Sequence, residues 1–270
     1  MITPRARRTG LVFNRSTFFD ILKFILLIAV LTFLIYRGTL GLGYNWQWFR
    51  VPKYLFLLED GTFTLGPLLN GLMVTFRITA WGLVLAFAFG LVTALFRLSH
   101  SFVAVVVARG YLELIRNTPL LVQIFFLYFV MAPVLGIERL FAAILALSLF
   151  EGAYASEILR AGIVSIHKGQ WEAAHSLGLT TFHTYRYIIL PQAIRRLLPP
   201  LTSQAISLIK DSALVSTIAV YELTMEGRAI VADTFMTFEI WFTVAAIYLV
   251  VTIILSLVVT VMEVRFKVVH

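Results

Sequence analysis

The sequence predicts an all-α membrane protein with six transmembrane helices, on the basis of three observations. First, 60% of the 270 residues are hydrophobic and 13% are charged, with a mean hydropathy of +0.92. A soluble domain of this length needs a more polar surface. Second, the apolar residues form runs long enough to cross a bilayer, which takes about 20 residues per helix. Third, Lys and Arg residues are concentrated between these runs.

Six helices are expected from length and hydropathy, with ends placed to within a few residues. They span about 18–36, 67–96, 101–131, 140–164, 200–220 and 238–262. The first follows a basic N-terminus, as the apolar part of a signal peptide would. It is long for that role, and the residues after it offer no convincing small-x-small cleavage site. We therefore expect an uncleaved membrane helix there.

Two of these helices carry features that predict close packing or a break. The second contains small residues spaced four apart, which let another helix approach closely; they are Gly82, Ala86, Gly90 and Ala94. In the third, Pro119 removes a backbone donor within an apolar run and disfavours helical geometry at Thr118. We expect a break at this point. The backbone freed by the break, at Asn117 and Thr118, is a candidate lining for a polar path.

The basic residues predict the orientation of the chain. The N-terminus, the second connection, the segment 165–199 and the C-terminus carry 11 Lys and Arg residues, against five in the alternate connections. The larger set consists of Arg5, Arg7, Arg8, Arg15, Arg97, Lys168, Arg186, Arg195, Arg196, Arg265 and Lys267. By the positive-inside rule, both termini and 165–199 face the cytoplasm. Orientation thus accounts for the net charge of +8 better than nucleic-acid binding does.

The polar stretch "GQWEAAHSLGLTTFHTYRYIILPQAIRR" (169–196) predicts a helix-turn-helix. Trp171, Ala174 and Leu177 recur at helical spacing, which indicates a short helix with a small mixed face. Gly178 follows, and glycine suits the left-handed conformation that ends many helices.

The second helix of this pair begins after a threonine. Thr180 or Thr181 can cap it, and we expect Pro191 to close it. An amphipathic hairpin resting on the membrane surface would have the same pattern, so the residues alone leave both interpretations open.

The same stretch also resembles a known motif. Its "EAAHSLG" and the later "ILP" resemble the EAA loop in the membrane permeases of bacterial ATP-binding cassette (ABC) importers. The matching residues are Glu172, Ala173, Ala174, Gly178, Leu190 and Pro191. The resemblance implies that the loop 165–199 forms a coupling helix, which docks on a separate ATP-binding subunit.

Four further motifs resemble the polar amino acid permease branch, which includes histidine, glutamine, glutamate and arginine importers. They are "LLNGLMVTFRIT" (68–79), "YLELIRNTPLLVQIFFLYF" (111–129), "GAYASEILRAGIVSIHKGQWEAA" (152–174) and "ISLIKDSALVSTI" (206–218). The similarity covers 67–265 and implies a five-helix permease domain there. Residues 1–66 then hold an N-terminal tail, one additional helix and an outer loop, which depart from compact members of the branch.

The resemblance also implies location and partners. The chain is expected in the bacterial cytoplasmic (inner) membrane, crossing it several times. Its expected partners are ABC ATPase subunits, a second permease copy or paralogue, and an extracytoplasmic amino-acid-binding protein. ATP and magnesium would be bound by the ATPase, because this chain has no G-x-x-x-x-G-K-[ST] motif.

No enzymatic or metal site is expected in the chain itself. It has no cysteine, and its five histidines lack the spacing of metal ligands. No nucleophile elbow occurs either. We therefore expect no catalytic residue, no metal and no cofactor in this subunit.

Charged residues at membrane depth are costly and mark candidate substrate contacts. Five lie near the expected midplane, and their mixed signs suit a zwitterion such as an amino acid. With three neighbouring polar residues, the candidate pathway is Thr75, Arg77, Arg116, Asn117, Glu151, Glu157, Lys210 and Asp211. Lys210 and Asp211 point about 100° apart on one helix, so they cannot both face one cavity.

Two local pairings are also expected from helical spacing. Arg109, Glu113 and Arg116 lie on one face of the third helix, and Glu157 lies three residues before Arg160 on the fourth. We expect Arg109, Glu113 and Arg160 to serve mainly in such pairs.

The predicted function is that of a permease subunit in an ABC importer for polar L-amino acids. It would form the translocation pathway and couple it to the ATPase through the loop 165–199. Two alternatives remain open at this point: an ion-coupled secondary amino acid transporter, and a non-transporting membrane scaffold subunit. The sequence also leaves open which amino acid is carried, whether the two permeases are identical, and what the additional helix does.

Overall fold

The computed structural model describes residues 15–41, 43–59 and 62–265. The chain divides into two compact units between Trp46 and Gln47, and each is described by itself. The predicted boundary at residue 66 stays a prediction. Of the basic residues used for orientation, Arg5, Arg7, Arg8 and Lys267 lie outside the described residues.

The first unit contains one long helix, α1 (Arg15–Gly41). Its stretch Phe18–Gly38 is long and apolar enough to cross a membrane. Near its start, Lys23 Nζ lies 3.8 Å from Asp20 Oδ1. The predicted helix at about 18–36 is therefore present and extends a few residues further at both ends.

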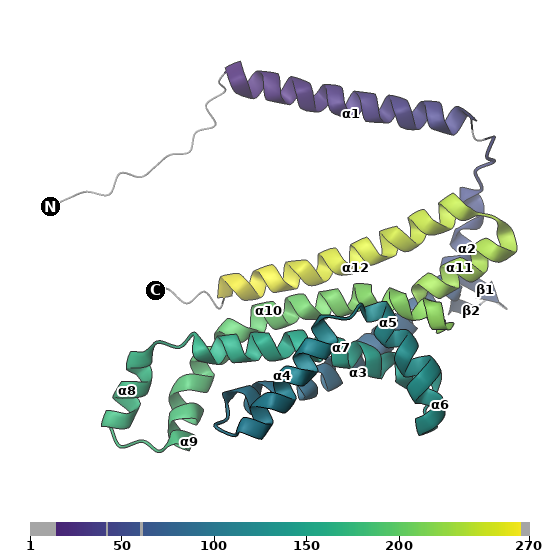
Figure 1. Cartoon of the computed structure of the whole chain (residues 1–270). Coiled ribbons are helices and arrows are strands. Elements are labelled where there is room, and N and C mark those ends of the chain that lie inside the picture. The colour runs from purple at the N-terminus through teal and green to yellow at the C-terminus, as the bar shows by residue number, and fades with distance from the viewer. Residues whose placement is uncertain (1–14, 42, 60–61, 266–270) are drawn as a thin grey trace. The chain divides into compact units, whose positions relative to one another are not determined.

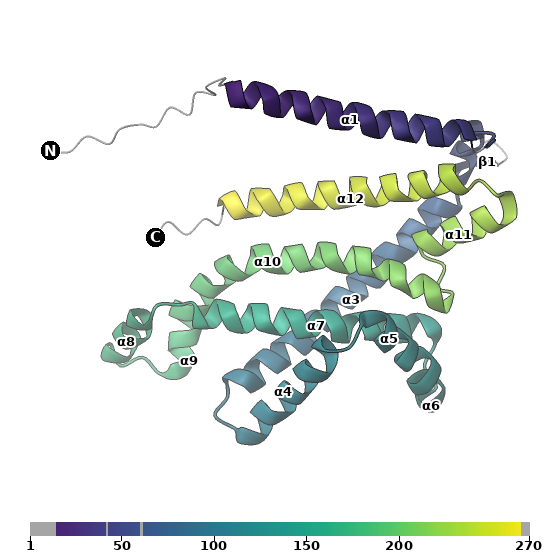
Figure 2. The same ribbon diagram turned by 45° about the horizontal axis from the view of Figure 1, so that its top comes forward.

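The second unit is mostly helical, with one small hairpin (Figures 1 and 2). Its long helices are α3 (Pro67–Leu98), α4 (Phe102–Arg116), α7 (Arg139–Val164), α10 (Leu190–Asp211) and α12 (Thr237–Arg265). The shorter ones are α2 (Pro52–Leu55), α5 (Leu120–Phe125), α6 (Ala132–Leu135), α8 (Lys168–Ser176), α9 (Thr181–Thr184) and α11 (Leu223–Thr234). Tighter 3-10 turns occur at η1 (Trp48–Arg50) and η4 (Ser212–Ile218), and wider π turns at η2 (Phe126–Met131) and η3 (Tyr185–Ile189).

The strands β1 (Phe56–Glu59) and β2 (Thr62–Leu65) form an antiparallel hairpin in which Phe56 pairs with Leu65. Together with α2 and α11, the hairpin lies at one end of the second unit (Figure 1). The helices α8 and α9 project from the opposite end (Figures 1 and 2). The prediction of an all-α protein is thus right for most of the chain but missed this hairpin.

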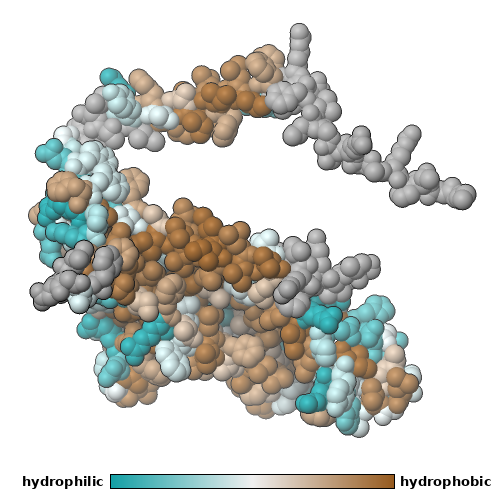
Figure 3. Space-filling model, turned by 180° about the vertical axis from the view of Figure 1, so that it is seen from behind, coloured by the Kyte–Doolittle hydropathy of each residue, from teal (hydrophilic) through white to brown (hydrophobic). Residues whose placement is uncertain are grey.

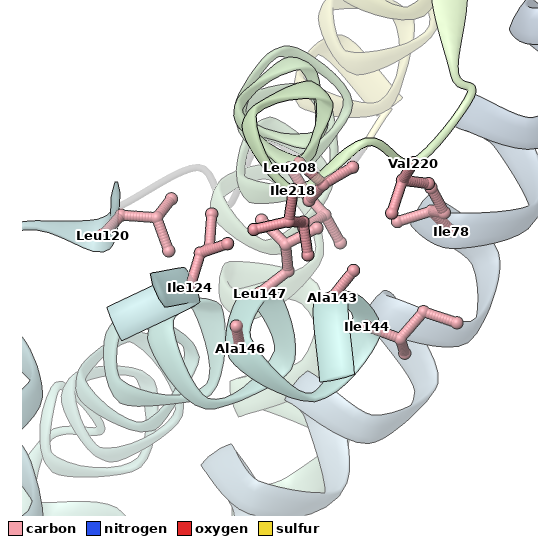
Figure 4. Close-up of a cluster of buried hydrophobic side chains, with 11 residues drawn as sticks. Ile78, Leu120, Ile124, Ala143, Ile144, Ala146, Leu147, Leu208, Ile218 and Val220 are labelled. Atoms are coloured by element: carbon pink, nitrogen blue, oxygen red, sulfur yellow. The ribbon is translucent and has the colours of Figure 1, made fainter. Parts of the chain in front are cut away.

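Close helix packing around α3 and α7 forms the centre of the second unit. The small residues predicted on α3 are all buried, and a Cβ added to Gly90 would lie 2.9 Å from Ala155 Cβ on α7. A buried apolar cluster joins α3, α5, α7, α10 and η4, with Leu147 and Leu208 near its middle (Figure 4). This cluster fixes the helices that carry the buried polar groups described below.

The surface of the protein supports a membrane location. Figure 3 shows apolar surface across the middle of the second unit and hydrophilic patches towards its two ends. Exposed apolar side chains on α12, such as Leu249, Ile254 and Leu257, contribute to the apolar part. Such a band fits the hydrocarbon layer of a bilayer.

Four helices in the described part of the chain are long and apolar enough to span a membrane, and a bent pair makes a possible fifth. The predicted helices at 67–96, 140–164 and 238–262 correspond to α3, α7 and α12 within three residues. The bent pair is Phe102–Arg116 with Leu120–Leu135, at an angle of 106°. The expected break at Pro119 is therefore confirmed, because the chain turns sharply there.

The predicted helix at 200–220 was wrong in its position. Helix α10 begins at Leu190, passes through Pro199 and Pro200, and ends at Asp211. A proline disrupts an isolated helix, but buried neighbours such as Ala193 and Leu197 hold α10 against the bundle. The expectation that Pro191 ends a helix was also wrong, because Pro191 lies in the first turn of α10 and the helix continues to Asp211.

Candidate functional site

The loop between α7 and α10 forms the predicted helix-turn-helix. His167 caps α8, with its Nδ1 accepting a hydrogen bond from Gly169 N at 3.0 Å. Gly178 ends the helix with φ = +73°, in the left-handed region. There, Gly178 N donates to His175 O at 2.9 Å and Leu179 N donates to Ala174 O at 3.1 Å. This paired closure confirms the predicted role of the glycine.

Helix α9 begins at the predicted threonine cap and continues into α10. Thr180 Oγ1 accepts from His183 N at 3.4 Å. The π turn η3 then leads into α10 without a break. Trp171 on α8 packs edge-on against Tyr185, with ring centroids 5.1 Å apart, and Ala174 is fully buried. These contacts fasten α8 to the helix that follows it.

Several residues of the loop are exposed. Glu172 and Ala173 are exposed on α8, in contrast to the buried Ala174. Leu177 after α8, Phe182 in α9 and Tyr187 in η3 each expose more than half of their surface. Leu190 and Pro191, also predicted as loop residues, instead begin α10 and are exposed there. The loop is therefore a fastened helix pair with an exposed, partly apolar outer side.

Glu157 on α7 is the centre of an ion-pair cluster. It accepts from Arg97 of α3, lies 3.1 Å from Arg160 Nη2, and lies 3.6 Å from Arg116 Nη1 of α4. The Arg116 guanidinium also lies over the ring of Tyr154, at 5.9 Å from its centroid. One carboxylate thus forms ion pairs with three arginines, so the cluster of four side chains has a net charge of +2.

The ion pairs in the structure differ in part from those predicted for these helices. The predicted pair of Glu157 with Arg160 is present, but Arg116 pairs across to α7 instead of with Glu113. Glu113 Oε2 accepts from Asn117 Nδ2 at 2.7 Å, so Asn117 caps the end of α4. Among the residues that the structure describes, no ion pair joins Arg109 to Glu113.

Glu151 on α7 is buried beside a small cavity. The cavity measures about 260 Å³ and its lining includes Glu151, Thr202 and Gln204. Gln204 Nε2 donates to Glu151 Oε2, and Glu151 Oε1 has no hydrogen-bond donor within the described ranges. The Asp211 carboxyl lies close enough for its charge to interact with Glu151. Two acids and an amide therefore converge at this point of the bundle.

The other predicted pathway residues do not join this cavity. Arg77 is exposed and lines a different groove, of about 370 Å³, with Trp81 and Glu138. Lys210 is exposed, whereas its neighbour Asp211 is half-buried and faces Glu151. The prediction that Lys210 and Asp211 face different surroundings is thus confirmed. Glu151 and Asp211 lie together, and the predicted basic residues lie elsewhere.

Thr75 belongs to a polar cluster that the sequence did not predict. Its Oγ1 lies 3.5 Å from Glu222 Oε2 and accepts from Leu223 N at 3.3 Å. Glu222 caps α11 and also accepts from Tyr248 of α12 at 2.9 Å. Burial raises the pKa of the Glu222 carboxyl, and the hydrogen bonds from Thr224 N and Met225 N oppose that rise. The only sequence signal was an acid within the apolar stretch "AVYELTMEG" (219–227).

Comparison with known proteins places these features in a family. Residues 86–268 match the family described as "Binding-protein-dependent transport system inner membrane component". The glutamine transport system permease protein of Escherichia coli is 41% identical over 204 residues, covering 74% of this chain and 93% of that protein. The L-cystine transport system permease protein of Bacillus subtilis is 40% identical over 202 residues, covering 74% of this chain and 86% of that protein.

Solved structures have a similar fold. A crystal structure of an amino acid ABC transporter with histidines matches with a TM-score of 0.70 and 38% identity, over 74% of this chain and 94% of that one. An inward-facing methionine ABC transporter matches with a TM-score of 0.66 at 18% identity, covering 75% of this chain and 97% of that one, which shows likeness of fold alone. The family model covers more than half of the chain, and the permeases above exceed 30% identity over most of their length. The chain therefore belongs to the family of inner membrane components of binding-protein-dependent transport systems.

Proposed function

We propose that this chain is the permease subunit of an ABC importer for polar L-amino acids. The observation that carries the proposal is its 41% identity to a glutamine transport permease over 93% of that protein's length. The L-cystine permease of similar identity supports the same substrate class. A member of this family is a transport component and not an enzyme, so ATP hydrolysis belongs to a separate subunit.

The loop 165–199 couples the permease to that ATPase. Support comes from the exposed residues of the segment that holds α8 and α9, among them Glu172, Leu177 and Phe182. The inner side is fastened by the contact of Trp171 with Tyr185 and by a hydrogen bond of 2.7 Å from Arg196 Nη1 to Ser165 O. A push on the outer side therefore reaches α7 and α10 directly, because both ends of the loop are tied to them.

Glu151 and Asp211 are the acids that contact the substrate in this proposal. A buried carboxylate is expensive unless it is paired, and Glu151 Oε1 lacks a donor within the part of the chain that the structure describes. The α-ammonium group of an amino acid would supply that donor. Thr75 and Asn117 are occupied in local hydrogen bonds, so we assign them positioning roles.

The chain crosses the membrane six times in this proposal, with both termini and α8 in the cytoplasm. Helix α10 is then the fifth of the six spans along the chain, although its four charged residues make it less apolar than the others. Its buried Leu208 and Ile209, and its position alongside α7 and α12 in Figure 1, support this assignment. The partners are two ATPase subunits that bind ATP and magnesium, a second permease copy or paralogue, and an extracytoplasmic amino-acid-binding protein.

Purification from the native membrane, followed by mass spectrometry of the bound proteins, tests the proposal. We expect an ATPase with a Walker A motif, which is lost when Glu172 and Gly178 are replaced but kept in Glu113→Ala. Glu113 is an exposed acid on α4, outside the loop, and serves as the control. A chain that purifies alone and imports an amino acid without ATP would contradict the proposal and favour an ion-coupled transporter. Unchanged function after neutralising Arg77, Glu151 and Asp211 would favour a scaffold.

A further inference from the structure

Helix α11 packs closely against α3 on one side and against α12 on the other, each time at a glycine. A Cβ added to Gly71 on α3 would lie 2.7 Å from Glu226 Cγ and 3.0 Å from Leu223 Cα, both on α11. On the other side, a Cβ added to Gly227 would lie 2.9 Å from Val244 Cγ2 on α12. The two glycines therefore allow α11 to approach both helices more closely than any larger residue would.

Glu222, at the start of α11, ties the same three helices together through hydrogen bonds. Its carboxyl accepts from Thr224 N and Met225 N, each at 2.9 Å, and from the Tyr248 hydroxyl of α12 at 2.9 Å. Thr75 of α3 donates to it at 3.5 Å. Because this carboxyl is fully buried, separating the helices would leave it without these donors, which is costly.

The links on both sides of α11 are held in an uncommon backbone conformation. Ala219 has φ = +56° and Phe235 has φ = +59°, in the left-handed region that disfavours residues with a Cβ. Arg139 at the start of α7 donates to Ala219 O at 2.8 Å. Such a conformation persists only where the surrounding contacts determine it. The hydrogen bond from Arg139 thus fixes the link that leads into α11, and the left-handed Phe235 ends the helix.

We propose that Glu222 is a positioning residue that holds α11 against α3 and α12, so that these three segments move as one rigid body during transport. The rigid body lies at the end of the unit opposite α8 and α9 (Figure 1). Motion driven from the loop therefore reaches this end through whole helices, and α11 does not swing as a separate gate. The inference rests on the proposed transport function, because movement during transport is its subject.

Cysteine cross-linking tests the rigid body cleanly, since the natural chain has no cysteine. One pair, Gly71→Cys with Glu226→Cys, joins α3 to α11, and a second, Gly227→Cys with Val244→Cys, joins α11 to α12. A Cβ added at the glycine would lie 2.7 Å from Glu226 Cγ in the first pair and 2.9 Å from Val244 Cγ2 in the second, and a cysteine sulfur on the partner would lie near the place of that γ carbon. We expect near-complete cross-linking and, in the oxidised transporter assembled with its ATPase, import within about twofold of the reduced form.

Import that is lost on oxidation and restored by a reductant would overturn the proposal, because α11 would then have to move against its neighbours. Failure to cross-link would also overturn it. If one of the two double-cysteine variants does not import even when reduced, the comparison of oxidised and reduced import is made with the other variant. Failure of the unmodified chain to import any amino acid in the same vesicles would count against the proposed function instead. The cross-linking yield does not depend on import, so the two failures can be told apart.

Variants of Glu222 test its own part in the rigid body. In the background of the first cysteine pair, Glu222→Ala should slow cross-linking several-fold and lower the maximal import rate, with the KM for the amino acid unchanged. Glu222→Gln keeps one acceptor oxygen and should restore most of both. Asp233→Ala, an exposed acid on the same helix, is the matched control. If Glu222→Ala cross-links as fast as Asp233→Ala, Glu222 does not position α11; where Glu222→Ala does not assemble, Tyr248→Phe takes its place with the same readout.

Discussion

Glu157 forms ion pairs with arginines from three helices. Arg97 of α3, Arg116 of α4 and Arg160 of α7 all reach its carboxylate. In a membrane, a cation without a partner is costly, and one acid that serves several arginines lowers that cost for each of them. The cluster holds the C-terminal ends of α3 and α4 against α7, in the part of α7 that precedes the loop with α8.

Replacing this acid should destabilise the protein more than replacing any one arginine. Glu157→Gln leaves three guanidinium groups without a carboxylate, and we expect a loss of about 1–3 kcal/mol in unfolding free energy. Arg116→Gln should cost less, because the Arg116 side chain is 47% exposed and its charge is screened. Melting temperatures of both variants in detergent check this, and an equal effect would contradict it.

Glu151 is the residue whose environment best fits contact with a cation on a substrate. We expect Glu151→Gln to lower kcat/KM for the amino acid about tenfold or more, since a hydrogen bond between charged groups contributes about 1.5–3 kcal/mol. The effect should fall mainly on KM. Glu113→Gln, an exposed acid on α4, is the control. Import kinetics in vesicles measure both, and an unchanged KM in Glu151→Gln would remove this residue from the pathway.

At the scale of elements, the turn between α8 and α9 depends on one glycine. A Cβ at Gly178 would meet no atom within 4 Å, so space is not the obstacle, but φ = +73° is unfavourable for any larger residue. For a β-branched residue we expect a cost of about 1–2 kcal/mol or more. The turn would then relax and shift α8 relative to α9.

Gly178→Val should therefore lower the amount of amino acid imported per ATP hydrolysed several-fold, without preventing membrane insertion. Gly178→Asn should preserve more coupling, because asparagine tolerates the left-handed region better than valine does. Parallel assays of ATPase activity and import decide the matter. Normal import by Gly178→Val would refute the coupling role of the loop.

The contact between α3 and α7 depends on small residues. A Cβ on Gly90 would lie 2.9 Å from Ala155 Cβ and 3.1 Å from Gly152 O, whereas a Cβ on Gly110 of α4 would meet nothing within 4 Å. We expect Gly90→Val to cost about 1–3 kcal/mol through overpacking, and Gly110→Val to cost far less. The yield of folded protein after solubilisation distinguishes them, and equal yields would show that the contact can relax.

At the scale of the whole molecule, the family resemblance and the division of the chain point to the second unit as the transporter. The compact unit begins at Gln47, and the family model matches 86–268. The relatives match 74% of this chain while filling 86–93% of their own length. About a quarter of this chain therefore has no counterpart in these relatives, although nearly their whole length is matched.

A chain that starts at Gln47 should accordingly assemble with the ATPase and import the same amino acid at a rate within a few-fold of the full chain. We expect lower yield, because α1 is removed together with the basic residues that hold its start in the cytoplasm, and the new N-terminus must then cross the membrane. Import by both forms, normalised to assembled complex, is the measurement. Complete loss of import in an assembled complex would assign an essential role to residues 1–46.

The sequence by itself determined the membrane class, the spans α3, α7 and α12, the break at Pro119, and the closure of α8 at Gly178. These follow from local signals, since hydropathy, proline and glycine act on the residues beside them. Only the tertiary structure decided that α10 continues through Pro199 and Pro200, and that Arg97 reaches Glu157, 60 residues away. The same holds for Thr75 and Glu222, 147 residues apart. Such pairs depend on which helix faces meet, and the spacing of residues along one helix does not contain that information.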